Sequence, residues 1–187
     1  MRHVLIVFST VDGHTHDIAE RLRALIQARG LEVVVMPLAE CSADDLARCD
    51  GVVIGASIRY GHHRPDVAAF IARHRAALEA RPNAFFSVNV VARKPGKDRP
   101  DTNPYMRKFL ATIAWRPQRL EVFAGKIDYP RYRFVDRQMI RLIMWLTQGP
   151  TDLDTVVEFT DWSRVEAFGA HMAQAVQGSE PAEANKW

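Results

Sequence analysis

Hydroxyl side chains and a turn signal follow the first apolar run of the sequence. Ser9 and Thr10 end this run, and a helical pattern begins behind Thr15. Between them, Asp12-Gly13 favours a turn. A loop that joins a strand to a helix gathers free backbone N–H groups at the positive end of the helix dipole, which suits a phosphate group. The predicted phosphate-binding residues are Ser9, Thr10, Val11, Asp12, Gly13, His14 and Thr15.

The glycine spacing of this loop excludes two common phosphate motifs. Gly13 is the only glycine before Gly30, so neither G-x-G-x-x-G nor the P-loop pattern is present. The stretch instead resembles the T-x-T-G-x-T loop of flavodoxins, which implies flavin mononucleotide (FMN), except that Asp12 replaces the middle threonine. Because a carboxylate would repel phosphate, we expect the Asp12 side chain to turn back onto a loop N–H. A tight turn that binds no ligand is the alternative interpretation.

Two later loops would flank the ring of a flavin in such a fold. In the first loop Tyr60 would stack on the ring, and in the second Asn89 would bond its pyrimidine edge while Arg93 places positive charge beside it. The alternative interpretation of Arg93 and its neighbours is a solvated basic turn. The predicted ring-binding residues are Ser57, Ile58, Arg59, Tyr60 and Gly61, followed by Asn89, Val90, Val91, Ala92 and Arg93.

Histidines and cysteines do not form a metal-ligand pattern. The pairs His62-His63 and His14-x-His16 lack helical i, i+4 spacing and an evident third ligand, so we expect no metal site. Cys41 and Cys49 stand alone, without a C-x-x-C motif. This usage favours a reducing compartment over a disulfide framework.

Strands alternate with helices along the chain and would position these loops. Short apolar runs predict strands at 4–8, 31–36, 51–56, 84–90 and 120–124, and helical periodicity separates them. This alternation predicts an α/β fold with a doubly wound, five-stranded parallel sheet in the order 2-1-3-4-5. Ligands of such sheets bind at the carboxyl ends of the strands, where loops 9–15, 57–64 and 88–95 would meet.

One segment interrupts the alternation. Residues 126–159 stand where a short connection would be enough, so we interpret them as an insertion. A helical pattern runs from Phe134 to Leu146, with an apolar face predicted at Val135, Met139, Leu142, Ile143 and Leu146. Such a helix would extend about 20 Å, too short to span a bilayer of about 30 Å. It would lie in a membrane interface, cover an apolar substrate, or pack on its own sheet or in a dimer interface.

Length and charge bound the remaining possibilities. The 187 residues predict a single domain over 1–178 and a tail at 179–187. We find neither a signal peptide nor an apolar stretch long enough to span a membrane. The net charge of +3 differs from the acidic balance of small flavodoxin-type electron carriers and favours an anionic partner.

Four stretches together resemble the bacterial menaquinone-dependent protoporphyrinogen oxidases, over about residues 3–170. The four stretches are Phe8-Ser9-Thr10-x-Asp12-Gly13-x-Thr15, Val53 to His62, Ser87-Val88-Asn89-x-Val91-Ala92-Arg93-Lys94-Pro95 and Tyr129-Pro130-Arg131-Tyr132-Arg133. The resemblance implies FMN-dependent oxidation of protoporphyrinogen IX to protoporphyrin IX in haem biosynthesis. It also implies that electrons pass to menaquinone or another respiratory quinone such as ubiquinone.

The resemblance also implies where the partners bind. Arg93, Arg131 and Arg133 would hold substrate propionates or lipid phosphates, and Tyr60 and Arg93 are the side chains expected nearest the reacting flavin. No side chain is a convincing general base. Residues 129–146 would contact the membrane surface, which places the chain in the cytoplasm, peripherally on the inner face of the cell membrane. We expect no nucleic-acid partner, and a homo-oligomer remains open.

Three other functions remain open at this point. A flavodoxin-like NAD(P)H quinone reductase would need a nicotinamide site, for which the sequence offers no fingerprint. An electron-carrier flavodoxin is disfavoured by the basic charge and the insertion. A basic membrane- or nucleic-acid-binding module that has lost its flavin would be colourless when purified.

Overall fold

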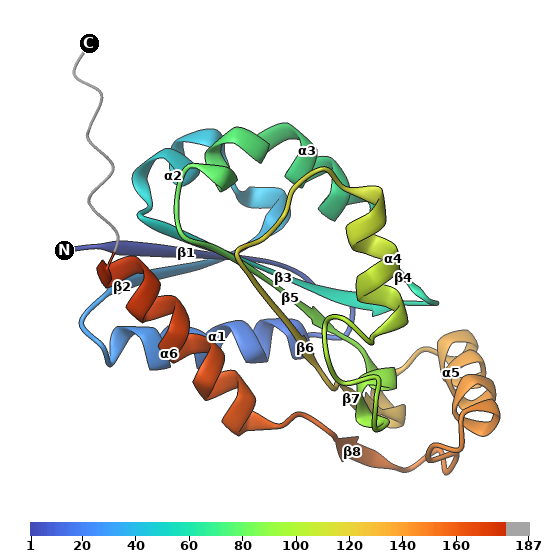
Figure 1. Cartoon of the computed structure of the whole chain (residues 1–187). Helices are drawn as coiled ribbons and strands as arrows, with labels where there is room; N and C mark the ends of the chain where they lie inside the picture. The colour runs from blue at the N-terminus through green and yellow to red at the C-terminus, as the bar shows by residue number, and fades with distance from the viewer. Residues whose placement is uncertain (179–187) are drawn as a thin grey trace.

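The structure, a computed structural model, describes residues 1–178 and shows a parallel sheet between two layers of helices (Figure 1). The predicted tail at 179–187 lies outside the described residues. Five parallel strands follow the order β2-β1-β3-β5-β6, which confirms the predicted order, because the short strand β4 pairs antiparallel with β3 off this path. The strands are β1 (His3–Ser9), β2 (Glu32–Pro37), β3 (Gly51–Arg59), β4 (His62–His63), β5 (Asn83–Val88) and β6 (Arg119–Phe123).

The helices cover both faces of the sheet (Figure 1). One layer holds α2 (Ala43–Arg48), α3 (Pro65–Glu79) and α4 (Pro104–Thr112), and the other holds α1 (His14–Gln27) and α6 (Trp162–Gly178). Short 3-10 turns lie at η1 (Leu38–Glu40), η2 (Val90–Arg93) and η3 (Tyr129–Arg131). The carboxyl ends of the strands therefore meet at one edge, as the predicted alternation requires.

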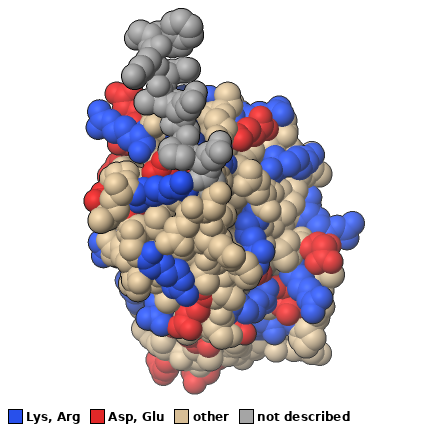
Figure 2. Space-filling view, turned by 60° about the vertical axis from the view of Figure 1, so that its left-hand side comes forward, with Lys and Arg blue, Asp and Glu red and all other residues tan. Residues whose placement is uncertain are grey.

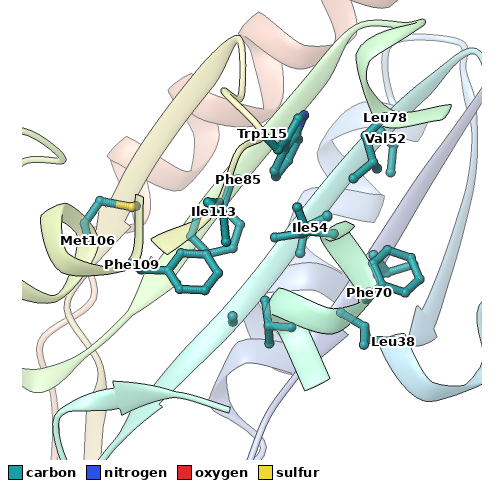
Figure 3. Close-up of a cluster of buried hydrophobic side chains, with 14 of the residues drawn as sticks. Leu38, Val52, Ile54, Phe70, Leu78, Phe85, Met106, Phe109, Ile113 and Trp115 are labelled. Carbon is teal, nitrogen blue, oxygen red and sulfur yellow. The ribbon is translucent and has the colours of Figure 1, made fainter. Parts of the chain in front are cut away.

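Two apolar clusters hold the layers to the sheet. Along β1, Leu5 and Val7 enter one cluster while Val4 and Ile6 enter the other, as the period-2 alternation of a strand requires. In the first cluster the Phe85 ring contacts Phe109 of α4 and Trp115 of the connection between α4 and β6 (Figure 3). Its ring centroid lies 5.2 Å from that of Phe109 and 6.4 Å from that of Trp115. η1, α3 and β3 contribute further members to the same cluster.

The insertion is a small unit of its own at the edge where the parallel strands end (Figure 1). Its strands β7 (Lys126–Asp128) and β8 (Val156–Glu158) pair antiparallel, and α5 (Phe134–Leu146) lies between them in the chain. A third apolar cluster is built on Ile127, Tyr129, Tyr132 and Met144. The insertion therefore begins and ends close to the predicted 126–159.

The packing of α5 divides the predicted apolar face. Ile143 points inward together with Ile140 and Met144, whereas Val135 and Leu146, predicted on the same face as Ile143, are 70% and 67% exposed. The helix is apolar on two sides, so a helical wheel alone could not show which side meets the sheet. One apolar side thus stays on the surface.

The structure also shows how charged side chains, long helices and possible metal ligands are distributed over the described residues. Figure 2 shows basic and acidic side chains intermixed on one face of the molecule. None of the described helices is long and apolar enough to cross a membrane. Within residues 1–178 no group of three or more His, Cys, Asp or Glu side chains is placed to hold a metal ion, and both cysteines are free thiols.

His63 is packed among aromatic rings beside the central strands. Its ring centroid lies 4.4 Å from that of Phe109 and 5.7 Å from that of Phe85, and its Nε2 is 2.9 Å from Ser87 Oγ. Burial lowers the pKa of His63 to about 4. The folded protein therefore holds this imidazole neutral.

We predict that His63 contributes to acid destabilisation. In the unfolded chain a histidine has a pKa of about 6.5, so between about pH 6.5 and pH 4 His63 is protonated when the chain is unfolded and neutral when it is folded. The free energy of unfolding therefore falls as pH drops through this range. In His63→Phe the free energy of unfolding, measured by urea titration at several pH values, should fall less steeply across this window. In the matched variant His62→Phe, which keeps His63, the wild-type slope should persist. An unchanged slope in His63→Phe would contradict the neutral form.

Candidate functional site

The loop between β1 and α1 has the shape of an anion-binding turn. Gly13 has a φ of +91°, in the left-handed region that glycine adopts at little cost, and it is the N-cap of α1. Its N–H donates to Thr10 Oγ1 at 3.1 Å, and its carbonyl accepts from the N–H groups of His16 and Asp17. No side-chain cap bonds this helix end within the described chain, so its first N–H groups are available to a ligand.

Besides His14 Nδ1, which lies 3.6 Å from Asp17 Oδ2, three polar atoms that border the cleft are buried without a hydrogen-bond partner. Thr15 Oγ1, Ser57 Oγ and Asn89 Nδ2 find none among residues 1–178, and Thr15 is only 1% exposed. Leaving such atoms unpaired costs free energy, so their presence indicates a ligand with polar atoms of its own. A phosphate would meet the threonine, and the polar edges of a flavin ring would meet the other two.

A cleft brings the three predicted loops together. The predicted residues that line it are Thr10, Asp12, His14, Thr15, Ser57, Ile58, Arg59, Tyr60, Gly61, Asn89, Val90 and Val91. Val11 and Gly13 line a neighbouring pocket that also borders the phosphate loop, and Ser9 and Ala92 are buried at the end of β1 and in η2. All three predicted loops thus contribute residues to the cleft.

The rest of the cleft lining comes largely from residues that sequence reasoning missed. The insertion supplies Lys126, Ile127, Tyr132, Ile140, Ile143 and Met144, and α4 supplies Tyr105. Helical periodicity marked α5 as amphipathic, but no local signal tells which of its residues would face loops more than 40 positions earlier in the chain. Ile127, Ile140, Ile143 and Met144 are apolar, so this part of the cleft suits an apolar ligand.

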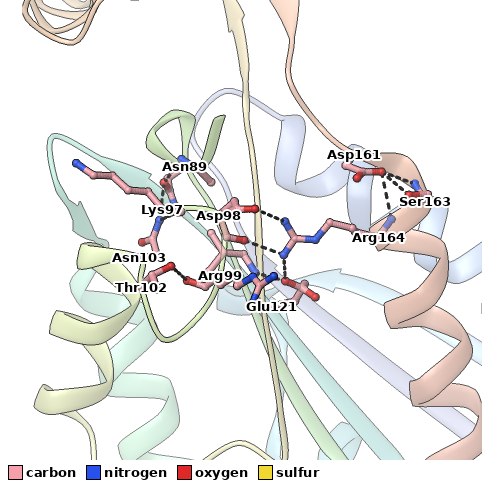
Figure 4. Close-up of polar contacts among 12 residues, drawn as sticks. Asn89, Lys97, Asp98, Arg99, Thr102, Asn103, Glu121, Asp161, Ser163 and Arg164 are labelled. Carbon is pink, nitrogen blue, oxygen red and sulfur yellow. Dashed lines mark hydrogen bonds and ion pairs between the residues drawn. The ribbon is translucent and has the colours of Figure 1, made fainter. Parts of the chain in front are cut away.

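The third loop is fixed by a polar network (Figure 4). Asn89 Oδ1 accepts from the Ala92 N–H at 3.1 Å and from Asn103 Nδ2 at 3.3 Å, while Asn103 Nδ2 also donates to the Lys97 carbonyl at 2.7 Å. Nearby, Arg164 joins the Asp98 carbonyl to the Glu121 carboxylate. Because its oxygen is held by the loop, Asn89 keeps its amide nitrogen for a ligand.

An arginine links the phosphate loop to the insertion. Arg59 Nη1 lies 2.7 Å from Asp12 Oδ2, Arg59 Nη2 lies 2.9 Å from Asp136 Oδ2, and the Tyr60 hydroxyl donates to Asp136. Burial lowers the pKa of Arg59, but the two carboxylates outweigh it and the net shift is upward. The Asp12 side chain therefore does not turn back onto a loop N–H as we expected, because a guanidinium neutralises it instead.

Arg93 lies away from the cleft, contrary to its predicted place at the flavin and substrate. Its guanidinium donates to the Val90 carbonyl at 3.0 Å and to the carbonyl and hydroxyl of Thr147 at 3.0 and 3.1 Å. It also lies 5.8 Å from the centre of the Phe159 ring. These acceptors are at the end of α5 and in η2, so Arg93 ties the third loop to the insertion.

The other two predicted arginines are exposed at the start of the insertion. Arg131 lines the neighbouring pocket beside the phosphate loop, together with Lys126 and Tyr132. Arg133 is the N-cap residue of α5. Tyr60, predicted to stack on the flavin, lines the cleft and is 48% exposed, with a φ of +49°.

Comparisons with known proteins identify the family. A sequence model of the flavodoxin domain matches residues 5–154. Over 169 residues, 90% of this chain and 93% of the relative, the sequence is 46% identical to protoporphyrinogen IX dehydrogenase (quinone) of Escherichia coli strain K12. The chain belongs to the quinone-dependent protoporphyrinogen IX dehydrogenase family. A relative of the same name from Leishmania major is 41% identical over 90% of this chain and 74% of its own length.

Solved structures agree on the fold. A flavodoxin from the domain Archaea superposes with a TM-score of 0.53 and 13% identity, covering 94% of this chain and 99% of its own. Oxidised flavodoxin 1 from Bacillus cereus gives a TM-score of 0.51 with 13% identity, covering 92% of this chain and 97% of its own. The flavodoxin domain indicates FMN as the cofactor, and the unpartnered atoms of Thr15, Ser57 and Asn89 fit it.

We predict that Thr15 binds the FMN phosphate. In Thr15→Val the phosphate loses a hydrogen bond from a buried hydroxyl, which for a charged acceptor is worth about 1.5–3 kcal/mol, so the FMN dissociation constant should rise about 10- to 100-fold. Quenching of flavin fluorescence measures it. Thr15→Ser, which keeps the hydroxyl, should bind almost as wild type, and Thr102→Val, at an exposed hydroxyl before α4, should be unchanged. Equal affinity in Thr15→Val and wild type would remove Thr15 from the phosphate site.

Proposed function

We propose that the protein oxidises protoporphyrinogen IX with bound FMN and passes the electrons to a quinone. The observation that carries the proposal is the cleft itself, in which the loops that suit a flavin face the apolar side of an inserted helix. The 46% identity to the Escherichia coli enzyme of that name supports the same conclusion. The chemistry that bound FMN would supply is the uptake of two electrons at a time.

The side chains of the cleft would orient a flat, apolar substrate. Ile140, Ile143 and Met144 give the porphyrinogen an apolar surface and exclude water from the reacting edge of the ring. Tyr60 and Tyr105 line the same cleft, and Tyr60 is held by Asp136. The propionates would reach outward to Arg133, which is exposed beside α5. None of these groups needs to act as a general base.

We further propose that the reaction belongs to haem biosynthesis and that the acceptor is a membrane quinone, menaquinone or ubiquinone. The protein would then act in the cytoplasm on the inner face of the cell membrane. The outer side of α5 supports this location, because Phe134, Val135 and Trp145 are 74%, 70% and 69% exposed. Arg133 and Arg141 are exposed on the same segment and suit anionic headgroups.

An anaerobic two-step reaction tests the proposed activity. FMN-loaded protein mixed with protoporphyrinogen IX should lose its flavin absorbance, and a menaquinone or ubiquinone analogue should restore it. Bleaching by NADH but not by porphyrinogen would favour an NAD(P)H quinone reductase instead. A long-lived semiquinone with two separate one-electron potentials would favour an electron carrier.

We predict that the outer side of α5 binds membranes. Val135→Asn combined with Trp145→Gln removes two exposed apolar contacts, together about 2 kcal/mol or more if they are buried in lipid, so binding to anionic vesicles should fall about tenfold or more. Co-sedimentation with vesicles of phosphatidylglycerol and phosphatidylethanolamine measures it. Val34→Asn, at a half-exposed valine of β2, is the matched control and should bind as wild type. Equal binding by the double variant would contradict the membrane role.

A further inference from the structure

A second pocket adjoins the cleft along the phosphate loop. It is lined by the loop from Thr10 to His14 and by Lys126, Arg131 and Tyr132 from the start of the insertion, and the cleft shares Thr10, Asp12, His14, Lys126 and Tyr132 with it. The phosphate loop therefore shares a pocket with two cationic side chains that no flavodoxin-type loop pattern contains. Neither cation belongs to the predicted phosphate-binding residues.

The position of Lys126 is set by the insertion. Lys126 pairs with Glu158 in the β7–β8 ladder, and its side chain lines both the cleft and the second pocket. Its Nζ lies 3.7 Å from Asp128 Oδ2, a long ion pair that leaves the ammonium able to take a second acceptor. Lys126 is thus a cationic side chain that lines both the cleft and the second pocket, as Thr10, Asp12, His14 and Tyr132 also do.

The charges around the loop explain why cations are needed. Asp12, Asp17 and Asp128 all line the second pocket and would repel a phosphate. Arg59 neutralises Asp12, Lys126 lies at ion-pair distance from Asp128, and Arg131 adds a positive charge to the pocket that Asp17 also lines. With the carboxylates offset, the positive end of α1 and the unpartnered Thr15 hydroxyl favour an anion at this loop.

We propose that Lys126 and Arg131 bind the 5′-phosphate of FMN, so that the insertion itself selects the phosphorylated flavin. Thr15 Oγ1, buried and unpartnered, is an independent sign that a ligand acceptor lies at this loop. The proposal rests on FMN as the cofactor and not on the oxidation of protoporphyrinogen. It assigns Arg131 to the cofactor rather than to a substrate propionate.

Comparison of FMN with riboflavin, which lacks the phosphate, tests this assignment. Full-length protein loaded with either flavin is diluted, and the fluorescence of released flavin gives each dissociation constant. In Lys126→Met the FMN constant should rise about tenfold or more, because a charge-assisted contact is lost, while the riboflavin constant stays as in wild type. Arg131→Met should change the ratio of the two constants in the same direction. Neither porphyrinogen nor quinone is present, so failure here is separate from failure of the proposed activity.

Matched variants separate a phosphate contact from a structural role. Lys126→Arg should keep the preference for FMN, and Lys97→Met, at an exposed lysine outside both pockets, should leave both constants unchanged. Thermal unfolding of each variant shows whether it is folded. An equal loss of FMN and riboflavin affinity in Lys126→Met would assign Lys126 to the fold of the insertion and overturn the proposal. An unchanged FMN constant would overturn it as well.

Discussion

The Arg59 guanidinium joins the two parts of the molecule on which the site depends. It extends from the end of β3 and binds Asp12 of the phosphate loop and Asp136 of α5, with its side chain 17% exposed. Removing Arg59 would leave the carboxylates of Asp12 and Asp136 without this shared cation, and because the guanidinium is largely buried its two ion pairs are worth more than pairs on the open surface. The same contact neutralises the carboxylate that would otherwise oppose a phosphate. One residue therefore positions the insertion and makes the loop suitable for its ligand.

The remaining construction follows from the parallel sheet. Parallel strands end at a common edge, so three loops far apart in sequence meet there without special contacts. An ordinary connection after β6 would leave that edge open on one side. The insertion fills this side, with Arg93 binding the carbonyl of Thr147 and the third apolar cluster holding β7 against α5. The apolar side chains of α5, Lys126 and the three predicted loops thereby line one cleft, and Arg131 lines the pocket beside it.

The sequence predicted what local periodicity and sheet topology determine. The five parallel strands, their order, the helix Phe134–Leu146 and the limits of the insertion all follow from repeating patterns, and so do the three loops that line the cleft. Strand β4 has two residues and leaves no periodic signal. The partners of Asp12 and Arg93 lie 47 and 54 positions away, so neighbouring residues could not indicate them. For α5, periodicity gave an apolar helix but not the direction in which it faces.

A crystal structure of the FMN complex tests most directly the claim that the insertion is part of the flavin site. The account predicts the phosphate on the N–H groups of the Thr10 to Thr15 loop, with Lys126 in contact with it. It also predicts the ring between the Ser57 to Gly61 loop and Val90-Val91, with Ile143 and Met144 beside it. A phosphate bound by the loop alone, with the Arg59 to Asp136 contact broken and α5 moved away from the ring, would contradict the account.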